Sequence, residues 1–395
     1  HSLSLTSFAL WQSDPHDLGI RTNGQEQANQ AVTSNLLFNN NSASYSFALK
    51  KFVVSATGGA GFFLHKIENS RAIDIPSKDL FVANSARTNY IHTYLTPKIE
   101  LNKKILIATL QCSINYYHYL YKANTTRRGM DYFYCSPSLR VQYNITPDLK
   151  WTVFGSLSDK KPNVFQWYDG MIIQNYRNLR LGQLTEKKSS SKIVSTTVAY
   201  KNLPLLLFAN ANVLLQWDGE EYRNFQDNGT IIYSSIPKSY QSSQQIMSAK
   251  VSKGIHWIDG AASLQGTYYA QHSRMNQNET LTPYSTNMYI LSGSINGKIG
   301  QIMDWNYNIS YSKSTLKTED EQLLAYRGLS NKLSTDWHLS KKITLRADTE
   351  HYKNEISEKK FKSIFFLDAS LVYKVNRKLE MSLNADNLLN KDRYD

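Results

Sequence analysis

Charged side chains recur at every second position near the C-terminal end of the chain. In "ITLRADTE", Arg346, Asp348 and Glu350 alternate with apolar residues. Cations and carboxylates at this spacing share one face of a β-strand, where they pair with charges on neighbouring strands. We expect a charge ladder on one face of a sheet, made by Lys332, Asp336, Arg346, Asp348, Glu350 and Asp386.

Motifs that support catalysis or metal binding do not occur. The sequence has no HExxH, GxSxG, GxxxxGK[ST] or GxGxxG motif, and its 9 His include no i, i+4 pair. The Gly-rich stretch "TGGAGF", residues 57–62, fits close contact between strands better than phosphate binding. We therefore expect that the chain is not an enzyme and that it has no catalytic residue, no metal and no cofactor.

Cys112 and Cys135 are the 2 cysteines of the chain. They form neither a disulfide framework nor a CxxC motif. Both lie at apolar positions of the alternating pattern, on two adjacent predicted strands. If these strands pair directly around the connection 122–130, the two cysteines do not lie opposite each other. Free thiols on the apolar face are the expectation, and a disulfide is the alternative.

Charge and hydropathy exclude two classes. The net charge of +13 comes from dispersed Lys and Arg rather than a basic helix, so we expect no nucleic-acid partner. No apolar run reaches the roughly 18 residues of a membrane-spanning helix.

Strict alternation of apolar and polar residues dominates the chain, in about 17 segments of roughly 9–14 residues. In "ILIATLQCSINYYHYLY", residues 105–121, the polar positions in the middle are Thr109, Gln111 and Asn115. "SPSLRVQYNI" likewise places Arg140 on its polar side, and "MDWNYNISY" places Asn306 and Asn308 there. These patterns predict an all-β antiparallel fold whose strands each have two different faces.

Short and long connections alternate between these segments. Short turns are predicted at 50–51, 102–104, 146–148, 201–204, 253–254, 298–301, 340–342 and 376–378. Longer polar connections are predicted at 12–43, 68–87, 122–130, 159–190, 218–239, 271–283, 314–325 and 353–361. About 9–11 residues cross a bilayer as a tilted strand, and lipid tolerates no open sheet edge. The pattern predicts a transmembrane β-barrel with a hydrated interior, short periplasmic turns and long extracellular loops.

Tryptophan positions agree with such a barrel. Trp151, Trp305 and Trp337 lie near short turns with apolar parity, as an interfacial girdle requires, whereas Trp257 takes polar parity. A β-propeller has a similar period of about 40–50 residues but needs four short strands in each. Propellers and other soluble β-folds remain alternatives.

The stretch "LEMSLNADNLLNKDRY" near the end of the chain resembles the penultimate-strand signature of TonB-dependent outer-membrane receptors. There, an alternating strand leads into Asn-Leu-Phe-Asn-Lys-x-Tyr. Leu389 stands where the family has Phe, and Asp392 is an extra residue. "SPSLRVQYNITPDLKWTVFGS" is also similar to strand pairs of these barrels, and the Asn-rich loops resemble Bacteroidetes members. The matching residues are Asn387, Leu388, Leu389, Asn390, Lys391, Arg393 and Tyr394.

The resemblance implies a barrel of 22 strands preceded by a plug, of which residues 1–395 would form one barrel domain with about 17 strands. The plug, the first strands and the last strand would lie outside this chain. It further implies a bacterial outer-membrane location and uptake of a siderophore, cobalamin, glycan or peptide. The implied partners are the TonB complex, acting through the plug, and outer-membrane lipid or lipopolysaccharide. A surface lipoprotein as a further partner is compatible with the resemblance.

On this interpretation the polar strand faces line the lumen, and the charge ladder fixes the barrel and plug rather than touching substrate. Substrate contacts are expected from the loop aromatics Trp167, Tyr168 and Tyr222. Three rivals stay open: a passive porin of 16–18 strands, a barrel for adhesion or assembly, and a soluble β-rich binding or carbohydrate-active protein.

Overall fold

The computed structural model describes most of the chain as one β-sheet. The described residues are 1–22, 25–70, 84–123, 126–160, 171–175, 178–181, 189–227, 230–277, 280–318, 322–357, 360–376 and 379–389. None of the helices in these ranges is long and apolar enough to cross a membrane.

The strands run almost end to end along the chain. Their bounds are β1 Ser2–Thr22, β2 Gln25–Leu49, β3 Phe52–Ser70, β4 Asn84–Asn102, β5 Leu106–Ala123, β6 Thr126–Asn144, β7 Leu149–Lys160, β8 Met171–Asn175, β9 Asn178–Leu181, β10 Ser189–Asn202, β11 Leu207–Asp227, β12 Thr230–Ile255, β13 Gly260–Gln277, β14 Thr280–Ile299, β15 Met303–Thr318, β16 Gln322–His338, β17 Ile343–Ser357, β18 Lys360–Lys374 and β19 Glu380–Ala385. One 3₁₀ turn, η2 His256–Ile258, separates β12 from β13.

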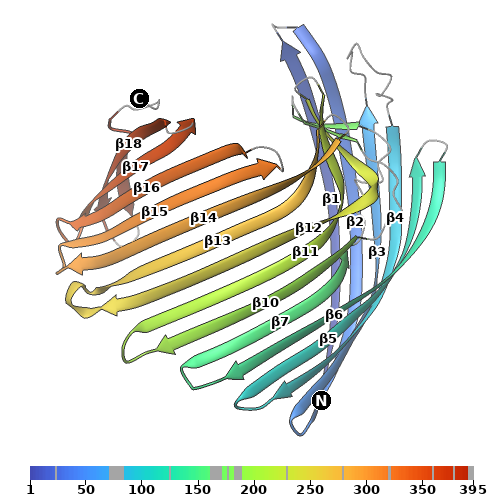
Figure 1. Ribbon diagram of the computed structural model, residues 1–395, viewed down its shortest axis with the longest axis horizontal. Coiled ribbons are helices and arrows are strands. Elements are labelled where there is room, and N and C mark those ends of the chain that lie inside the picture. The colour runs from blue at the N-terminus through green and yellow to red at the C-terminus, as the bar shows by residue number, and fades with distance from the viewer. Residues whose placement is uncertain are drawn as a thin grey trace.

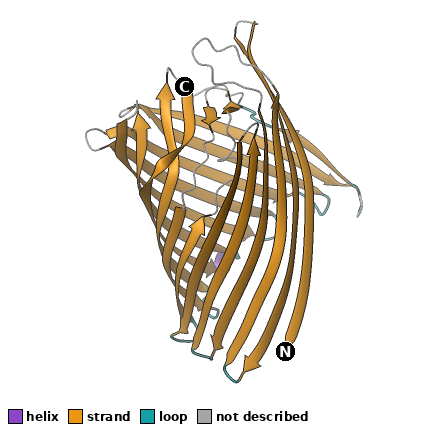
Figure 2. Cartoon of the chain, turned by 90° about the vertical axis from the view of Figure 1, so that its right-hand side faces the viewer, coloured by secondary structure: helices purple, strands orange, loops and turns teal. Residues whose placement is uncertain are grey.

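Seventeen of these strands form one antiparallel sheet in chain order, which confirms the predicted fold class. β1 to β7 pair in chain order, each with the next one along. β7 then pairs with β10, and pairing in chain order continues from β10 to β19. The sheet curves until β2–β6 and β13–β16 face each other across an interior (Figures 1 and 2). Among the described residues β1 and β19 do not pair, so each presents a free edge.

The strands are longer than the sequence indicated, reaching 26 residues in β12. Most residues of six predicted connections lie in strands instead, namely 12–43, 122–130, 218–239, 271–283, 314–325 and 353–361. For example, β1 and β2 together cover 2–22 and 25–49, and β11 extends to Asp227. Beyond the apolar band both faces of a strand are polar, so hydrophobic alternation disappears although backbone pairing continues. The connection 159–190 also holds the short strands β8 and β9, and β9 pairs in parallel with β12.

Seven of the eight predicted turns overlap a gap between strands. The prediction at 253–254 is wrong, because both residues lie in β12. The chain turns instead through η2 and Asp259, whose φ of 45° is left-handed. Trp257 lies in this turn rather than in a strand, which explains its exceptional parity.

The two faces of the sheet differ sharply. Leu110 on β5 and Leu139 on β6 lie directly opposite each other and are 52% and 47% exposed. On the other face of β5, Tyr117, Tyr119 and Tyr121 are buried. A convex face with nothing over it cannot bury large side chains, so the buried tyrosines mark the concave face. We call the face of Leu110 the outward face.

The Gly-rich stretch has the predicted role of allowing close strand contact. A Cβ on Gly61 would lie 2.6 Å from the Asn39 carbonyl oxygen, and one on Gly59 would lie 2.7 Å from that of Asn41. These glycines let β2 and β3 approach where any side chain would collide.

Candidate functional site: the concave face

A charge pair near the centre of the predicted ladder joins β16 and β17. Lys332 and Glu350 lie directly opposite each other, with Nζ 2.5 Å from Oε1. The Tyr352 hydroxyl donates to the second Glu350 oxygen at 2.7 Å. Both Glu350 oxygens are therefore engaged, which fixes the carboxylate against the wall.

A second pair lies four residues further along each strand toward the short turns. Arg346 donates through Nε and Nη2 to both oxygens of Asp336, at 2.7 and 3.1 Å. This two-bond geometry holds the planar guanidinium in one orientation. The arrangement is structural in character, because each charge is matched within the wall.

Asparagines and a further carboxylate extend this ladder sideways. Asn306 lies opposite Ser334, and Asn308 lies opposite Lys332. Asp348 lies opposite both Ser334 and Asp368, so two carboxylates face each other across β17 and β18. The structure thus brings together the following predicted residues on the concave face of β15–β17: Asn306, Asn308, Lys332, Asp336, Arg346, Asp348 and Glu350.

The other predicted polar residues lie elsewhere. Thr109 and Arg140 are opposite neighbours on β5 and β6, far along the sheet from the ladder. Gln111 shares their face, and Asn115 Oδ1 accepts a hydrogen bond from His92 Nε2 at 3.0 Å. Asp386 follows the end of β19 and does not join the ladder.

Only some of the predicted loop and motif residues lie among the residues that the structure describes. Trp167 and Tyr168 lie outside the described residues, as do Asn390, Lys391, Arg393 and Tyr394. Tyr222 belongs to β11 opposite Ser235 and is therefore in a strand, not in a loop. Asn387, Leu388 and Leu389 follow β19. The backbone N–H of Asn387 donates to Asp368 Oδ1 at 2.6 Å.

Sequence reasoning missed an aromatic cluster on the concave face, toward the long connections. Tyr119 is 0% exposed and packs edge-on against Tyr132, with centroids 5.5 Å apart. His92 stacks on Tyr117 at 4.1 Å with an interplanar angle of 3°. The cluster, called the aromatic cluster below, comprises Tyr90, His92, Tyr117, Tyr119, Tyr132 and Tyr134.

The available signal was alternation among tyrosines themselves. "YYHYLY" and "DYFYC" put a tyrosine at every second position, at Tyr117, Tyr119, Tyr132 and Tyr134. These four tyrosines are at most 9% exposed, so their rings pack against one another rather than present a surface to a ligand. Within the described ranges, no group of three or more His, Cys, Asp or Glu could hold a metal ion.

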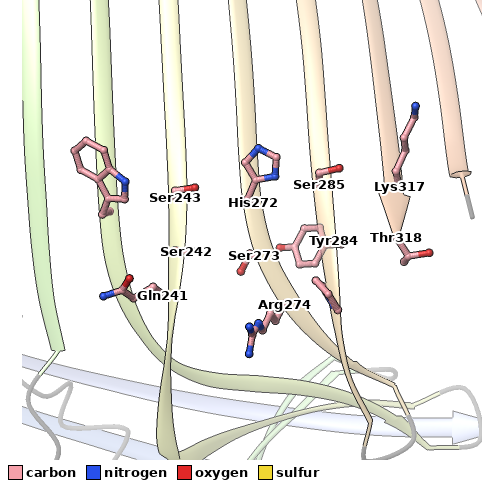
Figure 3. A pocket seen from close by; sticks show the side chains of 12 residues that line it. Gln241, Ser242, Ser243, His272, Ser273, Arg274, Tyr284, Ser285, Lys317 and Thr318 are labelled. Atoms are coloured by element: carbon pink, nitrogen blue, oxygen red, sulfur yellow. The ribbon is translucent and has the colours of Figure 1, made fainter. Parts of the chain in front are cut away.

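A hollow of about 540 Å³ lies toward the long connections of β11–β15 (Figure 3). His272, Ser285 and Lys317 lie side by side across β13, β14 and β15 at its centre. The register places these residues on the outward face, since His272 shares its parity with Leu264, which is 58% exposed. Ser242, Ser273, Tyr284 and Thr318, which also line the hollow, have the opposite parity, so residues of both faces surround it.

Comparisons with known proteins give a likeness of shape only. No protein-family model matches the chain, and no curated protein matches it. Solved structures similar to it include the copper transporter OprC, with TM-score 0.48 and 8% identity over 98% of this chain and 74% of that one. The siderophore receptor PirA from Pseudomonas aeruginosa gives 0.46 and 11% over 98% and 74%.

The ferripyoverdine receptor of the Pseudomonas aeruginosa outer membrane, bound to ferripyoverdine, gives a TM-score of 0.45 and 10% identity, over 98% of this chain and 62% of that one. At these values the likeness does not identify a family or a function. The function is therefore inferred from the two different faces of the curved sheet.

Proposed function

We propose that this chain forms the wall of a bacterial outer-membrane barrel for active, TonB-dependent uptake of a scarce nutrient. The observation that carries the proposal is the two-sidedness of the sheet: exposed leucines on the convex face and a charge ladder on the concave face. Lipid tails suit the first surface and water suits the second. A soluble sheet would bury the leucines and expose the charges.

Lipid contact also bears on the free edges of β1 and β19. Bilayer lipid offers no hydrogen-bond partner, so strands in the hydrocarbon region form closed barrels. We propose that further strands complete the wall, in keeping with the 22 strands implied by the resemblance of residues 379–394 to TonB-dependent receptors. The same resemblance supports the plug and the TonB complex as partners.

The concave face divides into two functional regions in this proposal. The two ion pairs of the charge ladder, Lys332 with Glu350 and Arg346 with Asp336, hold the wall, or a plug, in place. The aromatic cluster lies toward the long connections, where its buried tyrosines pack together and stabilise the wall. No bond is made or broken by this chain. The substrate would be a siderophore, cobalamin, glycan or peptide, the classes that the resemblance implies.

Uptake assays test the proposal. The strain lacking the full-length protein is grown with iron siderophores, cobalamin, glycans or peptides as the limiting nutrient, beside a strain lacking TonB. We expect both strains to fail on the same one of these classes and to grow normally on the rest. Normal growth of the deletion strain on every class would contradict active uptake.

A passive porin is the second candidate, and the count of 17 paired strands favours it because porins have about 16–18. Dependence on TonB separates the two functions. Uptake that requires this protein but continues without TonB would identify a porin. Detergent-free extraction of the protein would exclude both and favour a soluble β-rich binding protein.

A further inference from the structure

Basic residues line up on the outward face of β3–β6, at the ends of the strands that lead into the long connections. Lys66 on β3 lies directly opposite Arg87 on β4, Arg87 opposite Lys122 on β5, and Lys122 opposite Arg127 on β6. All of them are exposed. We call these residues, Lys66, Arg87, Lys122 and Arg127, the basic row.

Such a row is unfavourable without an anion. Like charges directly opposite each other on neighbouring strands destabilise a sheet. Adjacent strands are about 4.8 Å apart, so three steps place the cations along about 14 Å. Among the described residues, Lys66 has a carboxylate partner, Glu68, at 2.5 Å. Arg87 Nε donates to Asn89 Oδ1 at 3.2 Å, which orients its guanidinium.

The row lies at the border of the apolar band. On the same face and toward the short turns come Leu120, Ile91 and Phe133, which are 39%, 55% and 57% exposed. On β5 the same face carries Tyr116 and His118 just before Leu120; Tyr116 donates to Asp131 at 2.7 Å, and His118 Nδ1 lies 2.7 Å from the same oxygen. Apolar, hydroxyl and imidazole groups thus border the cations on this face, as acyl chains and the interfacial region border the head groups of a membrane leaflet.

We propose that the basic row binds the phosphate groups of an anionic glycolipid in the outer leaflet. Phosphate oxygens accept paired hydrogen bonds from Arg87 and Arg127, while Lys66 and Lys122 act as point charges. The phosphates would relieve repulsion within the row, and the acyl chains would cover the leucines beside it. This inference rests on the proposed outer-membrane location.

The choice of occupant follows from this combination of groups. A free phosphate would match the cations but leave the apolar band uncovered. A phosphorylated glycolipid matches both surfaces at once. Each cation near an anionic membrane surface adds about 1 kcal/mol, so loss of the whole row should weaken binding at least tenfold.

Native mass spectrometry of the purified protein in neutral detergent tests the inference, with bis-phosphorylated lipid A as the probe. The variant replaces the basic row by Gln: Lys66→Gln, Arg87→Gln, Lys122→Gln and Arg127→Gln. The matched control removes the same number of cations at the short-turn end of the same strands: Lys50→Gln, Lys51→Gln, Lys103→Gln and Lys104→Gln. We expect the control to bind as the wild type does and the row variant to bind at least about tenfold more weakly.

Equal binding by the row variant and the wild type would overturn the inference, as would an equal loss in the control, which would reflect net charge alone. Displacement of the lipid by millimolar inorganic phosphate would show a simple anion site and also contradict it. Heat-dependent mobility on gels confirms that both variants are folded. Because no transport is measured, failure of lipid binding leaves the uptake proposal standing, and failure of uptake leaves a lipid-bound wall.

Discussion

The sulfur atoms of Cys112 on β5 and Cys135 on β6 lie 3.1 Å apart on the outward face. Both are free thiols, as the sequence led us to expect. The register places Cys112 opposite Pro137 and Cys135 opposite Ile114, so the cysteines are diagonal rather than direct neighbours. Their side chains lean toward each other across the strand pair.

This proximity predicts cross-linking by a reagent that needs two thiols. Dibromobimane becomes fluorescent when it alkylates two neighbouring sulfurs, and we expect fluorescence in stoichiometric yield from the folded wild type. Cys112→Ser should abolish the signal while leaving single-thiol labelling of Cys135 intact. An unlabelled wild type with both thiols accessible to a monofunctional maleimide would show that the strands are paired in another register.

A charged side chain on the outward face should destabilise the protein. Leu110→Arg places a cation near the middle of the apolar band, which on β5 extends from Leu106 to Tyr116. We expect a loss of about 2–4 kcal/mol in the free energy of unfolding from phospholipid vesicles. Gln111→Arg puts the same charge on the concave face, opposite Lys98, and should cost less than about 1 kcal/mol. Equal costs at the two positions would mean that both faces meet the same medium.

The charge pair of Lys332 and Glu350 should couple weakly. The side chains are 47% and 24% exposed, so water screens the attraction. A double-mutant cycle with Lys332→Ala and Glu350→Ala, followed by urea unfolding, should give an interaction energy of about 0.2–1 kcal/mol. A coupling of several kcal/mol would indicate that the ladder is sealed from water, contrary to a hydrated interior.

Gly61 should not tolerate a methyl group. Its Cβ would collide with the backbone carbonyl of Asn39, so β2 and β3 would have to separate. We expect Gly61→Ala to destabilise the protein by about 1–3 kcal/mol. Gly58→Ala is the matched control, because the nearest atom to its Cβ would be 3.8 Å away, and it should change stability by less than about 0.5 kcal/mol. Similar denaturation midpoints for the two variants would argue against close pairing at Gly61.

Alternation by itself determined the fold class, the number of long strands and the two faces. Side chains of a strand point to opposite sides with a period of two, so the polar and apolar sets of "ILIATLQCSINYYHYLY" could be separated without coordinates. Most short turns could be located for the same reason, since Gly, Pro, Asn and Lys interrupt the alternation where the backbone reverses.

The tertiary structure decided how far each strand extends and which residues meet. Backbone pairing carries β11 to Asp227, past the point where apolar periodicity ends, because a strand beyond the lipid needs hydrogen-bond partners but no apolar face. Contacts across strands depend on register, which places Lys332 directly opposite Glu350 although the two are 18 positions apart in the sequence. For the same reason, the sequence shows dispersed basic residues, whereas the register of β3–β6 aligns Lys66, Arg87, Lys122 and Arg127 side by side.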